Sequence, residues 1–121
     1  MGARVVTVVG PNGRNRTDLA GYLQQAGFDV RAVDRMPRGS PAHRALVWLT
    51  DRDGDLVEVA ATIDAWLGAN GARRAIVVTW RPAAFRVVRE AYGDRLVALP
   101  APVFGWQVVD ALRARERGGV A

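Results

Sequence analysis

Short apolar runs recur along the chain and alternate with longer segments in which apolar and polar positions are mixed. Five of the runs are rich in the β-branched residues that strands favour. The predicted strands are Val5–Val9, Val30–Val33, Ala45–Leu49, Ala75–Thr79 and Leu96–Leu99. Several of them are apolar without alternation, as strands covered by helices on both faces must be. The pattern therefore predicts a five-stranded parallel sheet between two helical layers, which is a three-layer α/β fold.

Four segments between and after these strands carry helix signals. The first predicted helix is Thr17–Ala26, where apolar residues share one face and Gly27 supplies the stop. The second begins after Asp55, whose carboxylate can accept hydrogen bonds from the free amides of a first turn. The third begins near Pro82. Proline suits the first turn of a helix, because the backbone amides of that turn have no partner within the helix and the missing N–H costs nothing there. The last predicted helix is Gly105–Arg115.

The segment between Asp34 and Arg44 breaks the alternation of strands and helices. It contains Pro37, Gly39 and Pro41, and this density of helix breakers excludes a regular helix. We therefore expect the second crossover to be a loop or a single turn. No repeat, low-complexity tract or linker divides the chain, so we expect one domain over residues 1–121, with residues 118–121 frayed.

The composition excludes several kinds of site. The chain has no cysteine and one histidine, His43, so disulfides, thiolate metal sites and a histidine-based zinc site are not expected. No apolar stretch approaches the ~20 residues of a membrane span, and the apolar run near the N-terminus is too short for the core of a signal peptide. We expect a cytoplasmic protein that contacts no membrane and holds no metal.

The net charge of +5 is compatible with nucleic-acid binding, because clustered cations gain affinity by releasing phosphate counterions. All 17 basic residues are arginines, however, and they are scattered among 12 acidic residues. This distribution is more typical of the coding bias of a GC-rich genome than of a nucleic-acid surface. We expect no direct contact with nucleic acid.

Two segments carry a family resemblance. The segment Leu99–Phe104 (LPAPVF) precedes an amphipathic helix and resembles the place where response-regulator receiver domains usually have Lys-Pro-Phe. Thr79, which closes the fourth predicted strand, matches the switch serine or threonine of receivers. Together with the order of strands and helices over nearly the whole chain, these segments resemble a receiver domain. The resemblance implies a single domain of flavodoxin-like fold.

The residues that receivers use for phosphorylation are replaced in this chain. Receivers need an aspartate nucleophile after the third strand, two acids after the first strand that hold Mg²⁺, and a lysine after the fifth, because cations must neutralise the phosphoryl oxygens. Val9 and Gly10 stand at the positions of the acid pair, Thr50 at that of the nucleophile and Ala101 at that of the lysine. A shift of one residue would place Asp51 at the nucleophile position, although a loop or cap role is more common for aspartate. The resemblance therefore implies an aspartate-less receiver, whose degenerate phosphorylation site is Val9, Thr50, Asp51, Thr79 and Ala101.

The segment Gly10–Thr17 (GPNGRNRT) carries a second resemblance. It is similar to the phosphate-binding P-loop, G-x-x-x-x-G-K-[ST], with Asn15 at the second glycine and Arg16 at the lysine. The N-terminal third also resembles small P-loop kinases such as adenylylsulfate kinase, which implies ATP or another phosphate-bearing ligand. An ordinary Pro-Asn-Gly turn with a solvated basic rim is the alternative. The candidate anion-binding or nucleotide-binding residues are Gly10, Asn12, Gly13, Arg14, Asn15, Arg16 and Thr17.

The sequence is compatible with three functions. The first is a non-catalytic regulatory module that resembles a phosphorylation-independent receiver and needs no cofactor; the resemblance implies a protein partner or a homodimer contact through the last two helices and the fifth strand. The alternative is a degenerate P-loop protein that binds a nucleotide or phosphate with little or no catalysis. A third candidate is a small-molecule sensor, because Trp80 and Trp106 follow strands at the edge where open α/β sheets bind ligands, although ordinary packing is the more common role of tryptophan.

Overall fold

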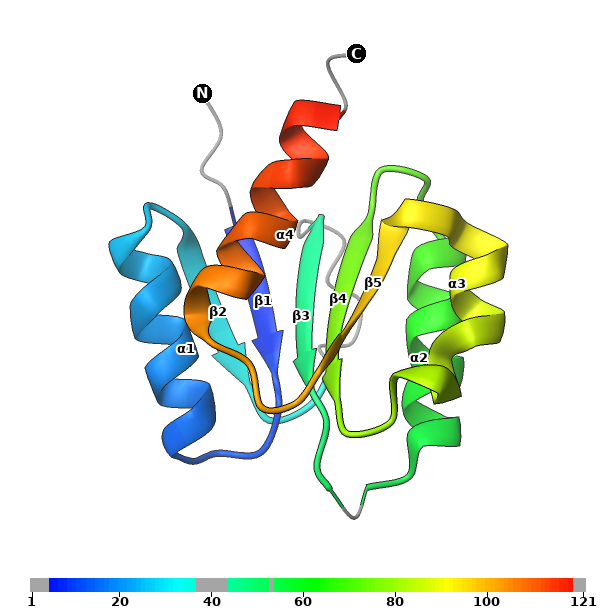
Figure 1. Cartoon of the computed structure of the whole chain (residues 1–121), viewed down its shortest axis with the longest axis horizontal. Helices are drawn as coiled ribbons and strands as arrows, with labels where there is room; N and C mark the ends of the chain where they lie inside the picture. The colour runs from blue at the N-terminus through cyan, green and yellow to red at the C-terminus, as the bar shows by residue number, and fades with distance from the viewer. Residues whose placement is uncertain (1–4, 37–43, 53, 119–121) are drawn as a thin grey trace.

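Five parallel strands form one sheet in the order β2-β1-β3-β4-β5 (Figure 1). The computed structural model describes residues 5–36, 44–52 and 54–118, the last four by their backbone alone. The strands are β1 (Val5–Val9), β2 (Asp29–Val33), β3 (Ala45–Leu49), β4 (Arg74–Thr79) and β5 (Leu96–Pro100). Every predicted strand is confirmed, and β2, β4 and β5 each extend one residue beyond the predicted run.

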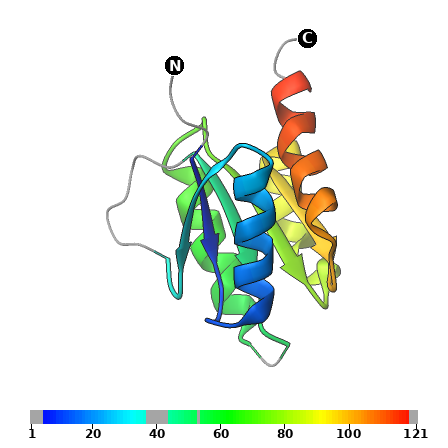
Figure 2. The same ribbon diagram turned by 90° about the vertical axis from the view of Figure 1, so that its left-hand side faces the viewer.

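Helices cover both faces of this sheet (Figures 1 and 2). The helices α1 (Arg14–Gln25) and α4 (Gly105–Gly118) lie on one face, and α2 (Leu56–Gly68) and α3 (Arg86–Tyr92) lie on the other. Short 3₁₀ turns precede and follow α3, at η1 (Pro82–Phe85) and η2 (Gly93–Arg95). The predicted three-layer α/β architecture is confirmed, and its strand order is that of flavodoxin-like folds.

The start of α1 differs from the prediction. The helix begins at Arg14, three residues before the predicted start at Thr17. The backbone amide of Thr17 donates to the carbonyl of Gly13 at 3.1 Å and so closes a helical turn. The loop after β1 is therefore only Gly10–Gly13, and the prediction of a loop as far as Thr17 is wrong. The sequence hides this start, because Gly13 offers no capping side chain.

The other helix starts follow the predictions more closely. Asp55 caps α2, since its Oδ1 accepts from two backbone amides of the first turn at 3.0 and 3.2 Å. Pro82 begins η1, and the α-helical part of this segment starts only at Arg86. The last helix begins at Gly105 as predicted and continues to Gly118.

The second crossover was predicted to lack a helix. Of its residues, the structure describes 34–36 and 44, and none of these is helical. The remainder, 37–43, and the predicted frayed end at 119–121 lie outside the described residues.

Apolar cores on both sides of the sheet explain why the strands lack alternation. The core beneath α1 and α4 includes the fully buried side chains of Val8, Leu23, Val47 and Val108. The core beneath α2 and α3 includes those of Val9, Ile63, Leu67, Val77 and Phe85. Each large apolar side chain removed from water in this way contributes about 1.5–3 kcal/mol. The two cores hold the carboxyl ends of the strands in fixed positions.

Candidate functional site

The carboxyl ends of all five strands lie at one edge of the sheet (Figure 1). The neighbours β1 and β3 continue into α1 and α2, which lie on opposite faces of the sheet. In open α/β sheets such a divergence of connections creates a crevice at the strand ends, where ligands bind. The segments that follow β1, β3, β4 and β5 therefore form the candidate site.

The corner after β1 is tightly packed. Val9 is fully buried in the core beneath α2 and α3, and Gly10 is buried as well. A Cβ atom at position 10 would lie 3.0 Å from Leu49 Cβ and 3.1 Å from the Leu49 carbonyl oxygen. A side chain at this position would therefore require Leu49, at the end of β3, to shift by a few tenths of an ångström.

Arg16 ties the short loop to the end of β2. Its Nη1 donates to the carbonyl oxygen of Gly10 at 3.2 Å and forms an ion pair with Asp34. Its Nη2 donates to Asn12 Oδ1 at 3.0 Å. The guanidinium is thus engaged by three acceptors, one of them an anion. Arg14, in contrast, is exposed and has no hydrogen bond or ion pair to any residue that the structure describes.

The ends of β3, β4 and β5 are joined by hydrogen bonds. Thr50 donates both its amide, at 3.0 Å, and its hydroxyl, at 2.9 Å, to the carbonyl of Val78. Thr79 is fully buried, and its Oγ1 accepts from the amide of Arg81 at 3.1 Å. The amide of Ala101 donates to the carbonyl of Thr79 at 2.8 Å. Thr50, Thr79 and Ala101, three of the positions predicted to form a degenerate phosphorylation site, therefore lie together here, and Asp51 beside them is exposed.

Two hollows open at this edge. The first, called the aromatic cleft below, has a volume of about 300 Å³ and is lined by Asn15, Asp18, Leu19, Tyr22, Leu49, Thr50, Val78, Trp80, Ala101, Pro102, Val103 and Gly105. The second, the loop hollow, has a volume of about 280 Å³ and is lined by Pro11, Asn12, Gly13, Arg14, Asn15, Arg16, Leu49, Thr50 and Asp51. They share Asn15, Leu49 and Thr50 and so adjoin at the end of β3.

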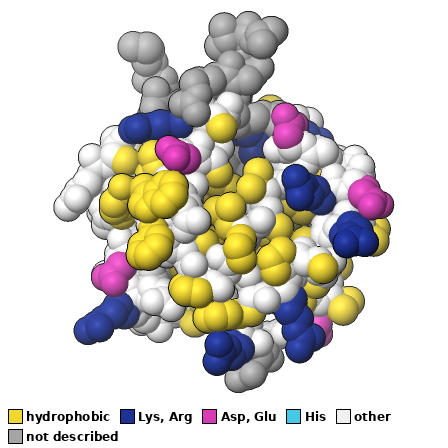
Figure 3. Space-filling view, viewed as in Figure 1, with side chains coloured by type: hydrophobic (Ala, Val, Ile, Leu, Met, Phe, Trp, Pro, Cys, Tyr) yellow, Lys and Arg dark blue, Asp and Glu magenta, His cyan; other side chains and the backbone are white. Residues whose placement is uncertain are grey.

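Exposed aromatic side chains gather at the same edge. Tyr22, Trp80, Phe104 and Trp106 are each between 44% and 69% exposed. Figure 3 shows apolar side chains over the face on which α1 and α4 lie. Of the two tryptophans that were predicted to line a crevice, Trp80 lines the aromatic cleft and Trp106 does not.

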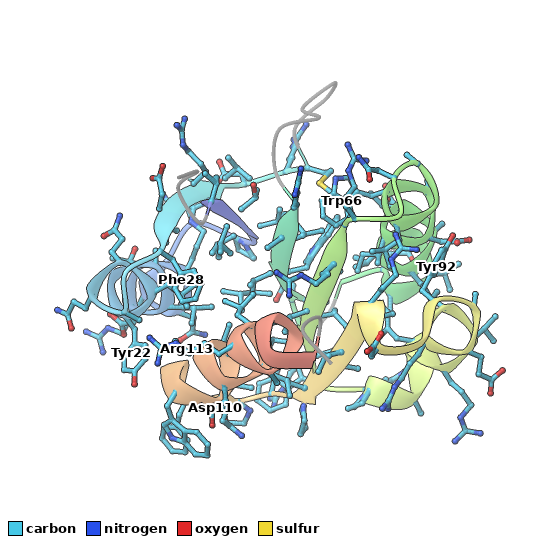
Figure 4. All side chains as sticks on the ribbon, turned by 90° about the horizontal axis from the view of Figure 1, so that it is seen from above. Tyr22, Phe28, Trp66, Tyr92, Asp110 and Arg113 are labelled. Carbon is cyan, nitrogen blue, oxygen red and sulfur yellow. The ribbon has the colours of Figure 1, made fainter. Side chains whose placement is uncertain are left out.

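The contribution of α1 to the aromatic cleft was not predicted from the sequence. Asn15, Asp18 and Tyr22 all line it, and Figure 4 shows Tyr22 on the side of α1 that faces α4. Their spacing of three and four residues places them on one helix face, which is a signal that the sequence does contain. It could be used only with the knowledge that this face meets the ends of β3 and β4.

Within the described residues, no group of three or more aspartate, glutamate or histidine side chains is arranged to hold a metal ion. No helix in that part of the chain is long and apolar enough to cross a membrane.

Comparison with known proteins identifies the fold. No protein-family model matches the sequence, and no curated protein matches it. A solved structure of a response regulator from Burkholderia pseudomallei, with a phosphorylated aspartic acid, a calcium ion and citrate, is 16% identical, with a TM-score of 0.69; the match covers 97% of this chain and 74% of that one. A CheY-like response regulator from Mesorhizobium loti is also 16% identical, with a TM-score of 0.67, over 93% of this chain and 98% of that one. The chain therefore has the flavodoxin-like fold of a response-regulator receiver.

Proposed function

We propose that the chain is a regulatory module of receiver type that does not accept a phosphoryl group and acts through contacts with a protein. The observation that carries the proposal is the crowding at Gly10, where receivers keep the acids that hold Mg²⁺. An acid there would require Leu49 to shift, and the neighbouring Val9 is fully buried in the core, so a pair of carboxylates at these two positions would require this corner to repack. Without them a carboxylate such as Asp51 has no Mg²⁺ to offset the charge of an incoming phosphoryl group.

The positions of the nucleophile and the lysine support the same proposal. The hydroxyl of Thr50 donates its hydrogen bond to the carbonyl oxygen of Val78, and the side chain of Ala101 is uncharged. Asp51 lies in the loop hollow with Arg14, on the exposed side of the loop. Phosphoryl transfer would thus need a nucleophile, a metal site and a cation that these positions do not supply. The proposed module needs no cofactor and no contact with a membrane or with nucleic acid, and it would act in the cytoplasm.

The surface proposed for the partner is formed by α3, β5 and α4. β5 is the last strand of the sheet, so one of its edges has no neighbouring strand among the described residues. Val87 on α3 is 77% exposed, and Phe104 and Trp106 stand exposed at the start of α4. Exposed apolar side chains of this size are typical of protein contacts. The partner is another protein or a second copy of the chain, and light scattering of the purified protein distinguishes the two.

The alternative function, binding of a nucleotide or phosphate by a degenerate P-loop, has one observation in its favour. The loop hollow is lined by the first turn of α1, in which no residue is acidic, and by the unengaged Arg14. Against it, Arg16, the residue at the lysine position, is already neutralised by Asp34. ATP could therefore be attracted by only one of the two arginines.

Incubation with acetyl phosphate and Mg²⁺, followed by intact mass spectrometry, tests the proposal. We expect no phosphorylated species in the wild type or in the control variant Asp51→Asn. A stoichiometric adduct that Asp51→Asn removes would overturn it. Calorimetric titration with ATP, with and without Mg²⁺, then tests the alternative. Micromolar binding that is lost in Arg14→Ala, a substitution of an exposed residue without partners among the described residues, would favour the nucleotide-binding function.

A further inference from the structure

The aromatic cleft is a formed cavity that the proposed regulatory function leaves unused. We propose that it binds a small planar heteroaromatic amine, about the size of a purine or an indole, whose amino group donates to Asp18. This inference goes beyond the regulatory function and does not depend on it. It rests on the size of the cleft, its aromatic walls and the chemistry of its three polar side chains.

The size and walls of the cleft suit one flat ring system. Its volume of about 300 Å³ is at the lower end of the range of small-molecule sites, about 300–1,000 Å³, so it suits a group of the size of a bicyclic ring. Leu19, Leu49 and Val78 supply apolar surface from α1 and from two strands. The rings of Tyr22 and Trp80 also line the cleft, and aromatic faces bind planar ligands by offset stacking.

The polar side chains of the cleft select a hydrogen-bond donor. The carboxylate of Asp18 offers hydrogen-bond acceptors, and it has no hydrogen bond or ion pair to a described residue. The hydroxyl proton of Thr50 is used on Val78, so its oxygen is left to accept from a ligand. Asn15 can accept or donate. An amine therefore matches this set, whereas a ligand with an anionic group at this point would be repelled by Asp18.

Both aromatic side chains of the cleft make a further contact with the protein. The guanidinium carbon of Arg52 lies 4.3 Å from the centroid of the Trp80 ring, and Arg52 does not line the cleft, so it supports the indole from outside. A Cβ at Gly105 would lie only 2.5 Å from Tyr22 Cγ. Glycine at this position thus lets the Tyr22 ring rest against the start of α4. Preformed walls lower the entropic cost of binding.

The position of the cleft suggests how a ligand would act on the module. Thr50 and Ala101, two of the degenerate phosphorylation positions, line the cleft, and so does Gly105, the first residue of α4. A bound ring would contact the end of β3 and the start of the helix that borders the proposed partner surface. The amine would then occupy the place where a receiver receives its phosphoryl signal.

Titration with 2-aminobenzimidazole, followed by calorimetry and by tryptophan fluorescence, tests the proposal. Benzimidazole is the matched probe, because it has the same rings without the amino group. We expect a dissociation constant below 1 mM for the amine and binding at least about tenfold weaker for benzimidazole, as the loss of a charge-assisted hydrogen bond implies. Asp18→Asn and Trp80→Ala should each weaken binding of the amine about tenfold.

Matched variants separate the cleft from its surroundings. Asp110→Asn changes an exposed residue outside the cleft and should bind the amine within about twofold of the wild type. Trp80→Phe keeps an aromatic wall and should retain most of the affinity if Trp80→Ala is too unstable to measure. Absence of binding to the wild type, or binding that Asp18→Asn leaves unchanged, would overturn the proposal.

A third probe, adenosine monophosphate, keeps this proposal distinct from the nucleotide-binding alternative. It carries an aminopurine and a phosphate, so it reports on both hollows. If it binds through its base alone, affinity is lost in Asp18→Asn and kept in Arg14→Ala, as we expect. Binding that needs Arg14 and ignores Asp18, with no affinity for 2-aminobenzimidazole, would refute the amine site and support the phosphate site of the loop hollow.

Discussion

Arg16 and Arg14 are two arginines of one helical turn with different expected roles. Arg16 holds the loop after β1 through Gly10, Asn12 and Asp34, and only 13% of its side chain is exposed. Arg14 is exposed and has no partner among the described residues. Replacement of each by alanine therefore separates a structural arginine from one that is available to an anion.

The magnitude follows from the contacts that each substitution removes. The ion pair of Arg16 with Asp34 contributes at most about 1 kcal/mol, because the Asp34 side chain is 68% exposed and the pair is screened by water. The hydrogen bonds to Gly10 and Asn12 contribute about 0.5–1.5 kcal/mol each. Arg16→Ala should thus lower the free energy of unfolding by about 1–4 kcal/mol, and the melting temperature by about 4–16 °C for a chain of this size. Arg14→Ala should change the free energy by no more than about 0.5 kcal/mol.

Differential scanning calorimetry of the two variants measures this difference. Asp34→Asn is the intermediate case, since it removes the ion pair and keeps the other two acceptors, and we expect a loss of at most about 1 kcal/mol. Equal melting temperatures for Arg16→Ala and Arg14→Ala would refute the structural role of Arg16. In that case Arg16, like Arg14, would be available to bind a phosphate, as the resemblance to a P-loop implies.

Three further predictions concern the scaffold. Asp55→Ala removes the cap of α2 and should lower the free energy of unfolding by about 1 kcal/mol, which urea unfolding measures as a lower midpoint at unchanged slope. The control Asp51→Ala changes an exposed residue and should leave the midpoint unchanged. Equal midpoints for the two variants would contradict the capping role of Asp55. Phe85→Ala empties a fully buried position and should cost about 3–5 kcal/mol in the same assay, and a loss below about 1 kcal/mol would show that the side chain is not packed as described. The hydrogen bond of Tyr92 to Asp64 raises the pKa of Tyr92 above its ordinary value of 10.0. The stabilising effect of this bond is therefore complete below pH 10 and is lost as the pH rises through the raised pKa. An ultraviolet titration of the wild type and of Tyr92→Phe identifies the signal of Tyr92, and its ionisation at or below pH 10 would contradict this bond.

The strands could be predicted from the sequence almost to the residue. Runs such as Val5–Val9 and Ala45–Leu49 are short, apolar and bounded by turn residues. A strand that is covered by helices on both faces must be apolar throughout, so this pattern indicates a central strand directly. The start of α2 was also predictable, because Asp55 is a capping residue whose geometry is local. Both signals lie within a few residues of the structure that they specify.

The start of α1 and the aromatic cleft were not accessible in the same way. Residues Arg14–Thr17 have neither an apolar stripe nor a cap, so their helical state depends on tertiary contacts such as those of Arg16 with the end of β2. The cleft combines one face of α1 with the ends of three strands that are distant in sequence. Trp80 and Trp106 both follow strands in the sequence, which does not distinguish them. Only the three-dimensional arrangement shows that Trp80 lines the cleft and that Trp106 does not.

The most direct test of the central claim is the response of the strand ends to a phosphoryl donor. In a two-dimensional amide NMR spectrum, the amides of Thr50, Thr79 and Ala101 report on the degenerate phosphorylation site. We predict that addition of acetyl phosphate with Mg²⁺ leaves these signals in place. Displacement of the three signals, reversed when the donor is exhausted and absent in Asp51→Asn, would contradict a receiver fold that works without phosphorylation.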